Sequence, residues 1–179
     1  MKNFFYGIIF TAVVILAGGF FFIKRGYLST EADQPAPGFE KKFAMSVVDA
    51  SVDRHAPDRK NPVQPTDENL VAGAKIYLDH CAGCHGLPSN PDSHFGHSFY
   101  PPVPQFFNEA PDMPENQNFY VTQHGTRWTG MPAWSKTLSE QQTWTVVTFI
   151  SHIEKLPPAA LKVLEQPASA PGAATPGSR

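Results

Sequence analysis

Cysteine is scarce in this chain, with two residues among 179. A structural zinc site usually takes four Cys or His ligands, often as pairs separated by three to five residues in the case of histidine. The two cysteines supply one pair, but the nearest histidine pair, His94 and His97, has only two intervening residues. The sequence also lacks clusters of lysine and arginine and any nucleic-acid-binding motif. These absences argue against a zinc domain and against a nucleic-acid partner.

Both cysteines lie in one pentapeptide, CAGCH, at residues 81–85. A Cys-x-x-Cys-His run is the attachment site of c-type haem. Its spacing lets one helical turn present the thiols of Cys81 and Cys84 to one edge of the porphyrin, where they add across the vinyl groups. The next residue, His85, then lies under the iron as its proximal ligand. The chain has one such run, so we expect one covalent haem c and no dihaem peroxidase.

A thioredoxin-like redox pair is the alternative interpretation of Cys-x-x-Cys, and it requires a preceding strand in a βαβ pattern. The preceding residues read ENLVAGAKIYLDH, with apolar or small side chains at Leu70, Ala74, Tyr77 and Leu78. This is helical spacing rather than the period of two that a strand shows. The sequence therefore favours haem attachment.

The second axial position of the iron needs its own ligand if the haem only carries electrons, because an open position admits oxygen. A methionine thioether fills this position and raises the reduction potential. Met1 starts the chain, Met45 lies upstream in a polar segment, and Met113 and Met131 lie in segments after the CAGCH run. Met131, Met113, a histidine and an open site are the alternatives at this point.

Four motifs follow one another in the order VAGAKIYLDHCAGCHG, YPPVPQF, TGMPAW and SEQQTWTVVTFISHI. On these motifs, residues 67–157 resemble a class I monohaem cytochrome c of the bacterial membrane-anchored type. The resemblance implies an all-α cytochrome c fold around one covalent haem, with Met131 as the distal ligand. Pro132 restricts the backbone of Met131 to extended conformations, and Gly130 removes a side chain where the backbone approaches the haem ring.

The resemblance also implies two long-range contacts. A proline carbonyl accepts a hydrogen bond from the second ring nitrogen of His85, which orients the imidazole. Among the three prolines of YPPVPQF we choose Pro104. The other contact joins a first helix and a last helix that cross closely, with Gly73 on the first against Phe149 on the second. Residues 87–100, LPSNPDSHFGHSFY, depart from the family's simple glycine-spaced run, so we expect this loop to cover the haem edge differently.

The N-terminus carries an uncharged apolar run at residues 4–23, FFYGIIFTAVVILAGGFFFI. A helix of this length spans about 30 Å, the thickness of the hydrocarbon core of a bilayer. Cleavable signals usually have a shorter core and a small-x-small site, so residues 1–25 are predicted to be a membrane anchor, with an uncleaved signal as the alternative. Haem attaches outside the bacterial inner membrane in this family. The resemblance therefore implies a single-pass inner-membrane protein with its haem domain in the periplasm.

Two further segments flank the expected haem domain. Residues 26–66 are predicted to form a polar linker with a short amphipathic helix, in which Phe39, Phe43 and Val47 share a face that rests on the haem domain or the membrane. Residues 158–179 are rich in alanine and proline and are predicted to be a disordered tail.

The predicted function is one-electron transfer by a membrane-tethered periplasmic cytochrome, without catalysis and without a small-molecule substrate. The alternative is an electron-entry subunit of a respiratory oxidase or periplasmic dehydrogenase complex. A catalytic or sensory haem protein would need an open sixth position, which the TGMPAW motif opposes. Residues 60–160 hold nine acidic and five basic residues. We therefore expect redox protein partners of the respiratory chain that are basic, or that dock on a neutral patch at the haem edge.

Overall fold

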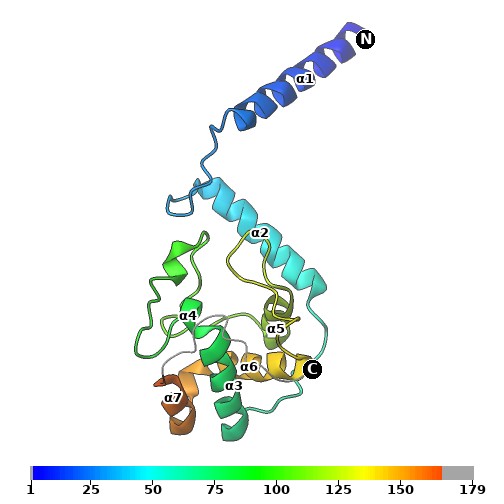
Figure 1. Ribbon diagram of the computed structural model, residues 1–179. Helices are drawn as coiled ribbons and strands as arrows, with labels where there is room; N and C mark the ends of the chain where they lie inside the picture. The colour runs from blue at the N-terminus through cyan, green and yellow to red at the C-terminus, as the bar shows by residue number, and fades with distance from the viewer. Residues whose placement is uncertain (1, 167–179) are drawn as a thin grey trace. The chain divides into compact units, whose positions relative to one another are not determined.

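The computed structural model describes residues 2–166, and this range contains helices and no β-strand. The helices, labelled in Figure 1, are α1 (Lys2–Lys24), α2 (Gly38–His55), α3 (Asp67–His80), α4 (Ala82–His85), η1 (Gly96–Ser98), α5 (Glu115–His124), α6 (Glu140–Ser151), η2 (Ile153–Lys155) and α7 (Pro158–Leu164). Contacts divide the chain into two compact units, one ending at Gln34 and the other beginning at Pro35. The all-α prediction is confirmed.

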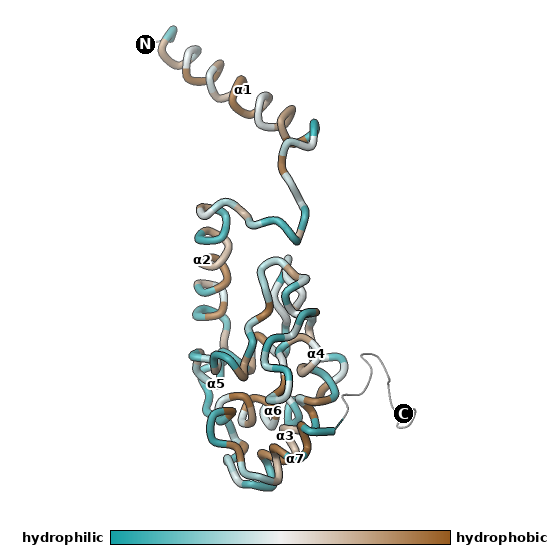
Figure 2. Tube along the Cα trace, turned by 90° about the vertical axis from the view of Figure 1, so that its left-hand side faces the viewer, coloured by the Kyte–Doolittle hydropathy of each residue, from teal (hydrophilic) through white to brown (hydrophobic). Residues whose placement is uncertain are grey.

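The first unit consists mainly of α1, a helix of 23 residues in which no side chain is buried. Apolar colours dominate this helix in Figure 2. At a rise of 1.5 Å per residue its length is about 35 Å, and the hydrocarbon core of a bilayer is about 30 Å thick. The helix is long and apolar enough to cross a membrane, and a signal sequence passes the same test of length and composition.

The core of the second unit is built on the crossing of α3 and α6. A Cβ atom on Gly73 would lie 2.5 Å from Cβ of Phe149 and 2.7 Å from the carbonyl oxygen of Thr145. Glycine lowers the stability of a helix by about 1 kcal/mol relative to alanine. The close approach of α6 explains why position 73 is nevertheless glycine. Tyr77, one turn further along α3, packs on Phe149 with ring centroids 5.1 Å apart. The predicted contact between Gly73 and Phe149 is confirmed.

Gly73→Ala is therefore expected to lower the free energy of unfolding by about 1–3 kcal/mol, because the new methyl group must push the backbone of α6 away. Urea unfolding of the purified protein measures the change. Gly83→Ala is the matched control, since Gly83 is exposed and a Cβ there has no neighbour within 4 Å. Equal midpoints for the two variants would contradict the close crossing.

Side-chain caps fix where the two crossing helices begin. The Thr66 hydroxyl accepts a hydrogen bond from the backbone N–H of Asn69 at the start of α3 (3.3 Å). At the start of α6, Ser139 and Gln142 form a reciprocal capping box with hydrogen bonds of 3.2 and 2.9 Å. Such caps contribute about 1 kcal/mol each. They set the register in which the glycine of α3 meets the aromatic ring of α6.

A second apolar cluster lies between α5 and α6. Trp144 stacks on Phe119 with ring centroids 4.0 Å apart and an interplanar angle of 13°. Val63, which precedes α3, is buried in the same cluster. The guanidinium of Arg59 lies 5.3 Å from the Phe119 ring and 5.4 Å from the Trp144 ring. The cluster holds the segment before α3 against the last long helix.

The prediction that residues 26–66 form a linker is wrong for the second half of that segment. Val52 in α2 is buried, and the carboxylate of Asp53 accepts a hydrogen bond from Nε2 of Gln117 in α5 (2.8 Å). Nδ2 of Asn61 donates to the hydroxyl of Thr148 in α6 (2.8 Å). The polar composition concealed this packing, because polar side chains such as Asp53 and Asn61 make many of its contacts.

The helix predicted within this segment is present as α2. It contacts α5 of the expected haem domain, but not through the predicted face. Phe39 and Phe43 are 78% and 70% exposed, and Val47 is 45% exposed. The opposite side of the helix, around Val52 and His55, faces α5 instead, where the His55 ring lies 6.2 Å from that of Tyr120.

The prediction of a disordered tail from residue 158 is also wrong at its start. Pro158 begins α7, where proline at the first helical position costs nothing. Ala160, Val163 and Leu164 are buried in the core cluster that contains Ala74 of α3. Their i, i+3, i+4 spacing places them on one helical face, a pattern hidden by the alanine- and proline-rich composition. The rest of the predicted tail, residues 167–179, lies outside the described residues.

Candidate haem site

The CAGCH pentapeptide lies where α3 ends and the short helix α4 begins. The carbonyl of Cys81 accepts hydrogen bonds from the backbone N–H groups of Cys84 (3.1 Å) and His85 (2.9 Å). The turn ends at Gly86, whose φ of +87° and close approach to the carbonyl oxygen of Pro91, 2.9 Å from where a Cβ would lie, both require glycine. One helical turn thus carries both thiols and the imidazole.

The two thiols are not joined in a disulfide. Burial, with a smaller contribution from neighbouring Cys84, raises the pKa of Cys81 to about 12. Burial also raises the pKa of Cys84. A thiol–disulfide exchange centre needs the opposite, a thiolate favoured by a lowered pKa. The protonated pair therefore does not suit thioredoxin-like chemistry.

The imidazole of His85 is oriented by two neighbours. Its Nδ1 lies 2.9 Å from the carbonyl oxygen of Pro104, and its ring stacks on Phe106 at a centroid distance of 4.2 Å. A carbonyl oxygen only accepts hydrogen bonds, so Nδ1 carries the proton and Nε2 keeps a free lone pair. Burial lowers the pKa of His85, although the hydrogen bond to Pro104 opposes this, and the neutral ring is favoured. Of the three prolines in YPPVPQF, the structure places Pro104 beside the imidazole.

Gln105, which the sequence analysis missed, connects the CAGCH turn to the loop that follows it. Its Nε2 donates to the carbonyl oxygens of Cys84 (2.9 Å) and Val103 (2.8 Å). Its Oε1 accepts from the backbone N–H of Ser93 (2.7 Å), and the Ser93 hydroxyl donates to the carbonyl of Gly83 (2.7 Å). The sequence could have indicated this role, because Gln105 is an amide among prolines and aromatic residues. A buried amide in such surroundings must be hydrogen-bonded.

Met131 lies half-buried in the loop between α5 and α6. Its carbonyl oxygen accepts a hydrogen bond from the backbone N–H of Thr126 (3.2 Å), and its own N–H donates to the hydroxyl of Thr129 (3.1 Å). Gly125 has φ +65°, and a Cβ there would lie 2.6 Å from the Met131 carbonyl oxygen. These contacts fold residues 125–131 into a closed loop around the methionine.

A ring contact joins this loop to the CAGCH turn. Trp134, three residues after Met131, lies 5.1 Å from the ring of His80, the residue before Cys81. The backbone N–H of Trp134 donates to the carbonyl of Thr122 in α5 (3.1 Å). The sequence analysis assigned neither His80 nor Trp134 to this contact. The assignment of Met131 as distal ligand stays a prediction.

The competing methionine, Met113, lies just before α5. Its carbonyl oxygen accepts a hydrogen bond from Nδ2 of Asn118 within that helix (2.9 Å). No contact described for Met113 leads to the CAGCH turn, whereas Trp134 and His80 join the Met131 loop to it. Within the described part of the chain, the contacts therefore favour Met131.

The donor set of the site fits haem c. It offers two protonated thiols for thioether bonds, a neutral imidazole with a free Nε2, and a thioether on a loop tied to the same turn. Within residues 2–166, no three His, Cys, Asp or Glu side chains gather into a metal-ion site. His97 pairs instead with Asp92, with Nε2 2.6 Å from the carboxylate.

Three comparisons with known proteins bear on the site. A sequence model of the family described as cytochrome c oxidase, cbb3-type, subunit III matches residues 68–150. Among solved structures, the chain is similar to one from the Kuenenia stuttgartiensis reducing HAO-like protein complex, with 21% identity, a TM-score of 0.43, and coverage of 52% of this chain and 48% of that one. The chain thus spans about half of the solved chain it matches. No curated protein matches.

Proposed function

We propose that residues 68–150, which match the family model, form a c-type cytochrome domain, and that the protein is a membrane-tethered, one-electron carrier with His/Met haem ligation. In this proposal Cys81 and Cys84 hold a single haem c covalently, and His85 and Met131 are its axial ligands. When bound, haem c supplies an iron that accepts and releases one electron. The protein binds no small-molecule substrate and breaks no bond.

The observation that carries the proposal is the fixed imidazole of His85. The Pro104 carbonyl 2.9 Å from Nδ1 sets the tautomer, and stacking on Phe106 sets the ring plane. A histidine held in this way presents Nε2 in one direction and gains basicity from its hydrogen-bonded partner. Rigid ligation suits electron transfer, because a ligand that does not move adds little reorganisation when the charge changes.

Membrane tethering is the second part of the proposal. We take α1 as an uncleaved anchor, with residues 25–37 as the connector to α2 and the haem domain on the periplasmic side. The length and composition of α1 support this, and so does the attachment chemistry of haem c. Mass spectrometry of the mature protein, together with alkaline carbonate extraction of membranes, tests it. A mature chain that begins after residue 25 and washes off with carbonate would contradict the tether.

The experiment for the function as a whole is spectroscopic. A reduced-minus-oxidised spectrum of detergent-extracted membranes is expected to show a c-type haem band that follows the mass of this chain on a haem-stained denaturing gel. Failure of the reduced protein to bind carbon monoxide at neutral pH would support six-coordinate iron. Ready binding of carbon monoxide would contradict the proposed axial pair.

The description of the matching family gives a second candidate function, an electron-entry subunit of a larger oxidoreductase. The same ligands would then deliver electrons inside a stable complex. Copurification in a fixed ratio with large membrane subunits in mild detergent would favour the subunit. Purification as a single chain that still exchanges electrons with a redox protein would favour the carrier.

A further inference from the structure

Phe99 lies on the loop that departs from the family pattern, and its ring packs against Gly130. A Cβ atom on Gly130 would lie 2.7 Å from Cε1 and 2.8 Å from Cγ of Phe99, and closer still to Cδ1. A side chain at position 130 would force the ring or the backbone to shift, so the ring occupies the space that such a side chain would fill. Gly130 directly precedes Met131. The Phe99 ring therefore packs against the backbone next to Met131, the proposed distal ligand.

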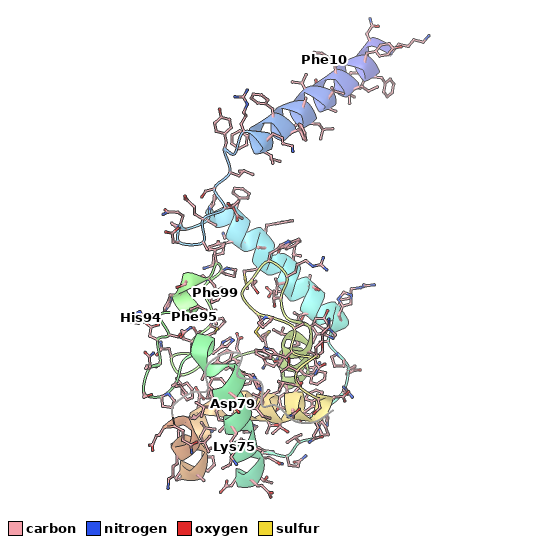
Figure 3. All side chains as sticks on the ribbon, viewed as in Figure 1. Phe10, Lys75, Asp79, His94, Phe95 and Phe99 are labelled. Atoms are coloured by element: carbon pink, nitrogen blue, oxygen red, sulfur yellow. The ribbon has the colours of Figure 1, made fainter. Side chains whose placement is uncertain are left out.

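Phe95 supports Phe99 from the same loop. Their ring centroids are 5.1 Å apart and their planes meet at 85°, and Figure 3 shows both on the segment that carries η1. Phe95 itself is 58% exposed, whereas Phe99 is half-buried. Edge-to-face pairs of this kind contribute about 0.5–1.5 kcal/mol beyond their buried area.

The other side of this loop is fixed to the haem-attachment turn. A Cβ on Gly96 would collide with the carbonyl oxygen of Cys84, and the Gly96 carbonyl accepts a hydrogen bond from the backbone N–H of Val103 (3.2 Å). The hydrogen bonds of Gln105 to Cys84 and Ser93 close the base of the loop. The loop is therefore bonded to the turn of His85, the proposed proximal ligand, and lies against the loop of Met131, the proposed distal ligand.

We propose that Phe99 is a positioning residue that holds the Met131 loop in place, and that position 130 requires glycine because the Phe99 ring fills the space there. This inference rests on the proposed His/Met ligation and adds a residue to it. It also explains the glycine at position 130 by the Phe99 ring. The sequence analysis had instead expected close approach of the backbone to the haem ring.

Phe99→Ala is expected to loosen the Met131 loop and to let an external ligand compete with the thioether. Titration of the ferric holoprotein with imidazole should show binding about tenfold tighter, which corresponds to about 1.4 kcal/mol. The sulfur-to-iron charge-transfer absorbance should weaken. Phe99→Leu should retain most of that absorbance. Phe95→Ala, which removes only the ring that supports Phe99, should tighten imidazole binding less than Phe99→Ala does. Equal effects of Phe95→Ala and Phe99→Ala would overturn the proposal.

A reciprocal test uses Gly130→Ala alone and combined with Phe99→Ala. The single variant is expected to lose the charge-transfer absorbance and lower the potential, because the new methyl group would force the ring or the backbone before Met131 to shift. The double variant should regain most of the absorbance, since removal of the ring makes room for the methyl group. A double variant no better than Gly130→Ala would show that the haem or the backbone requires the glycine, and the proposal would fail.

Met131→Ala, measured beside these variants, separates failure of this inference from failure of the proposed function. If Met131→Ala keeps the charge-transfer absorbance, the His/Met ligation is wrong. If Met131→Ala loses it while the Phe99 and Gly130 variants show no coupling, the ligation holds and the role of Phe99 is wrong.

Discussion

Replacing both Cys81 and Cys84 with alanine is expected to abolish covalent haem binding completely. The two thiols are the only cysteines in the chain, and one helical turn presents them together. Without them no thioether can form, and the haem-stained band on a denaturing gel should disappear. Each single variant should leave one thioether, which a pyridine haemochrome spectrum distinguishes from two.

Gly83→Ala is the control for this experiment, because it changes a residue between the two cysteines without removing a thiol. A Cβ there meets nothing within 4 Å, so haem attachment should proceed as in the unaltered chain. Pigment that survives acid–acetone extraction from the double alanine variant would contradict covalent attachment at this turn.

Met131→Ala is expected to open the sixth position of the iron and to lower the reduction potential on the order of 0.1 V or more. Axial ligands span roughly 0.8 V in haem proteins, and a thioether stabilises ferrous iron. The sulfur-to-iron charge-transfer absorbance should vanish, and carbon monoxide should bind the reduced protein. A redox titration combined with absorbance spectra measures all three changes.

Met113→Ala is the matched control, since it removes a thioether from the segment that leads into α5. Met113 is 37% exposed, and the hydrogen bond that it accepts from Asn118 uses the backbone carbonyl, which the substitution keeps. The potential and the spectrum should therefore be unchanged. If Met113→Ala lowers the potential and Met131→Ala does not, the distal ligand is Met113.

Two predictions made from the sequence agree with the structure, one from a short-range pattern and one from the family resemblance. The helix before the cysteines follows from apolar spacing within fourteen residues of α3. The pairing of Gly73 with Phe149 followed from the family resemblance, and the structure places the two residues in direct contact. The predicted tail and linker failed for one shared reason. Their overall composition is polar or proline-rich, although residues such as Val52 and Val163 are buried.

The sequence by itself was enough to predict haem chemistry for the CAGCH turn, because the order Cys81, Cys84, His85 lies within one helical turn and needs no distant partner. It also determined the apolar length of α1. Only the tertiary structure decided which proline carbonyl reaches His85, and that the Phe99 ring rests on Gly130. These contacts join residues 19 and 31 positions apart along the chain. Local spacing carries no information about such distances, since the path of the intervening loop sets them.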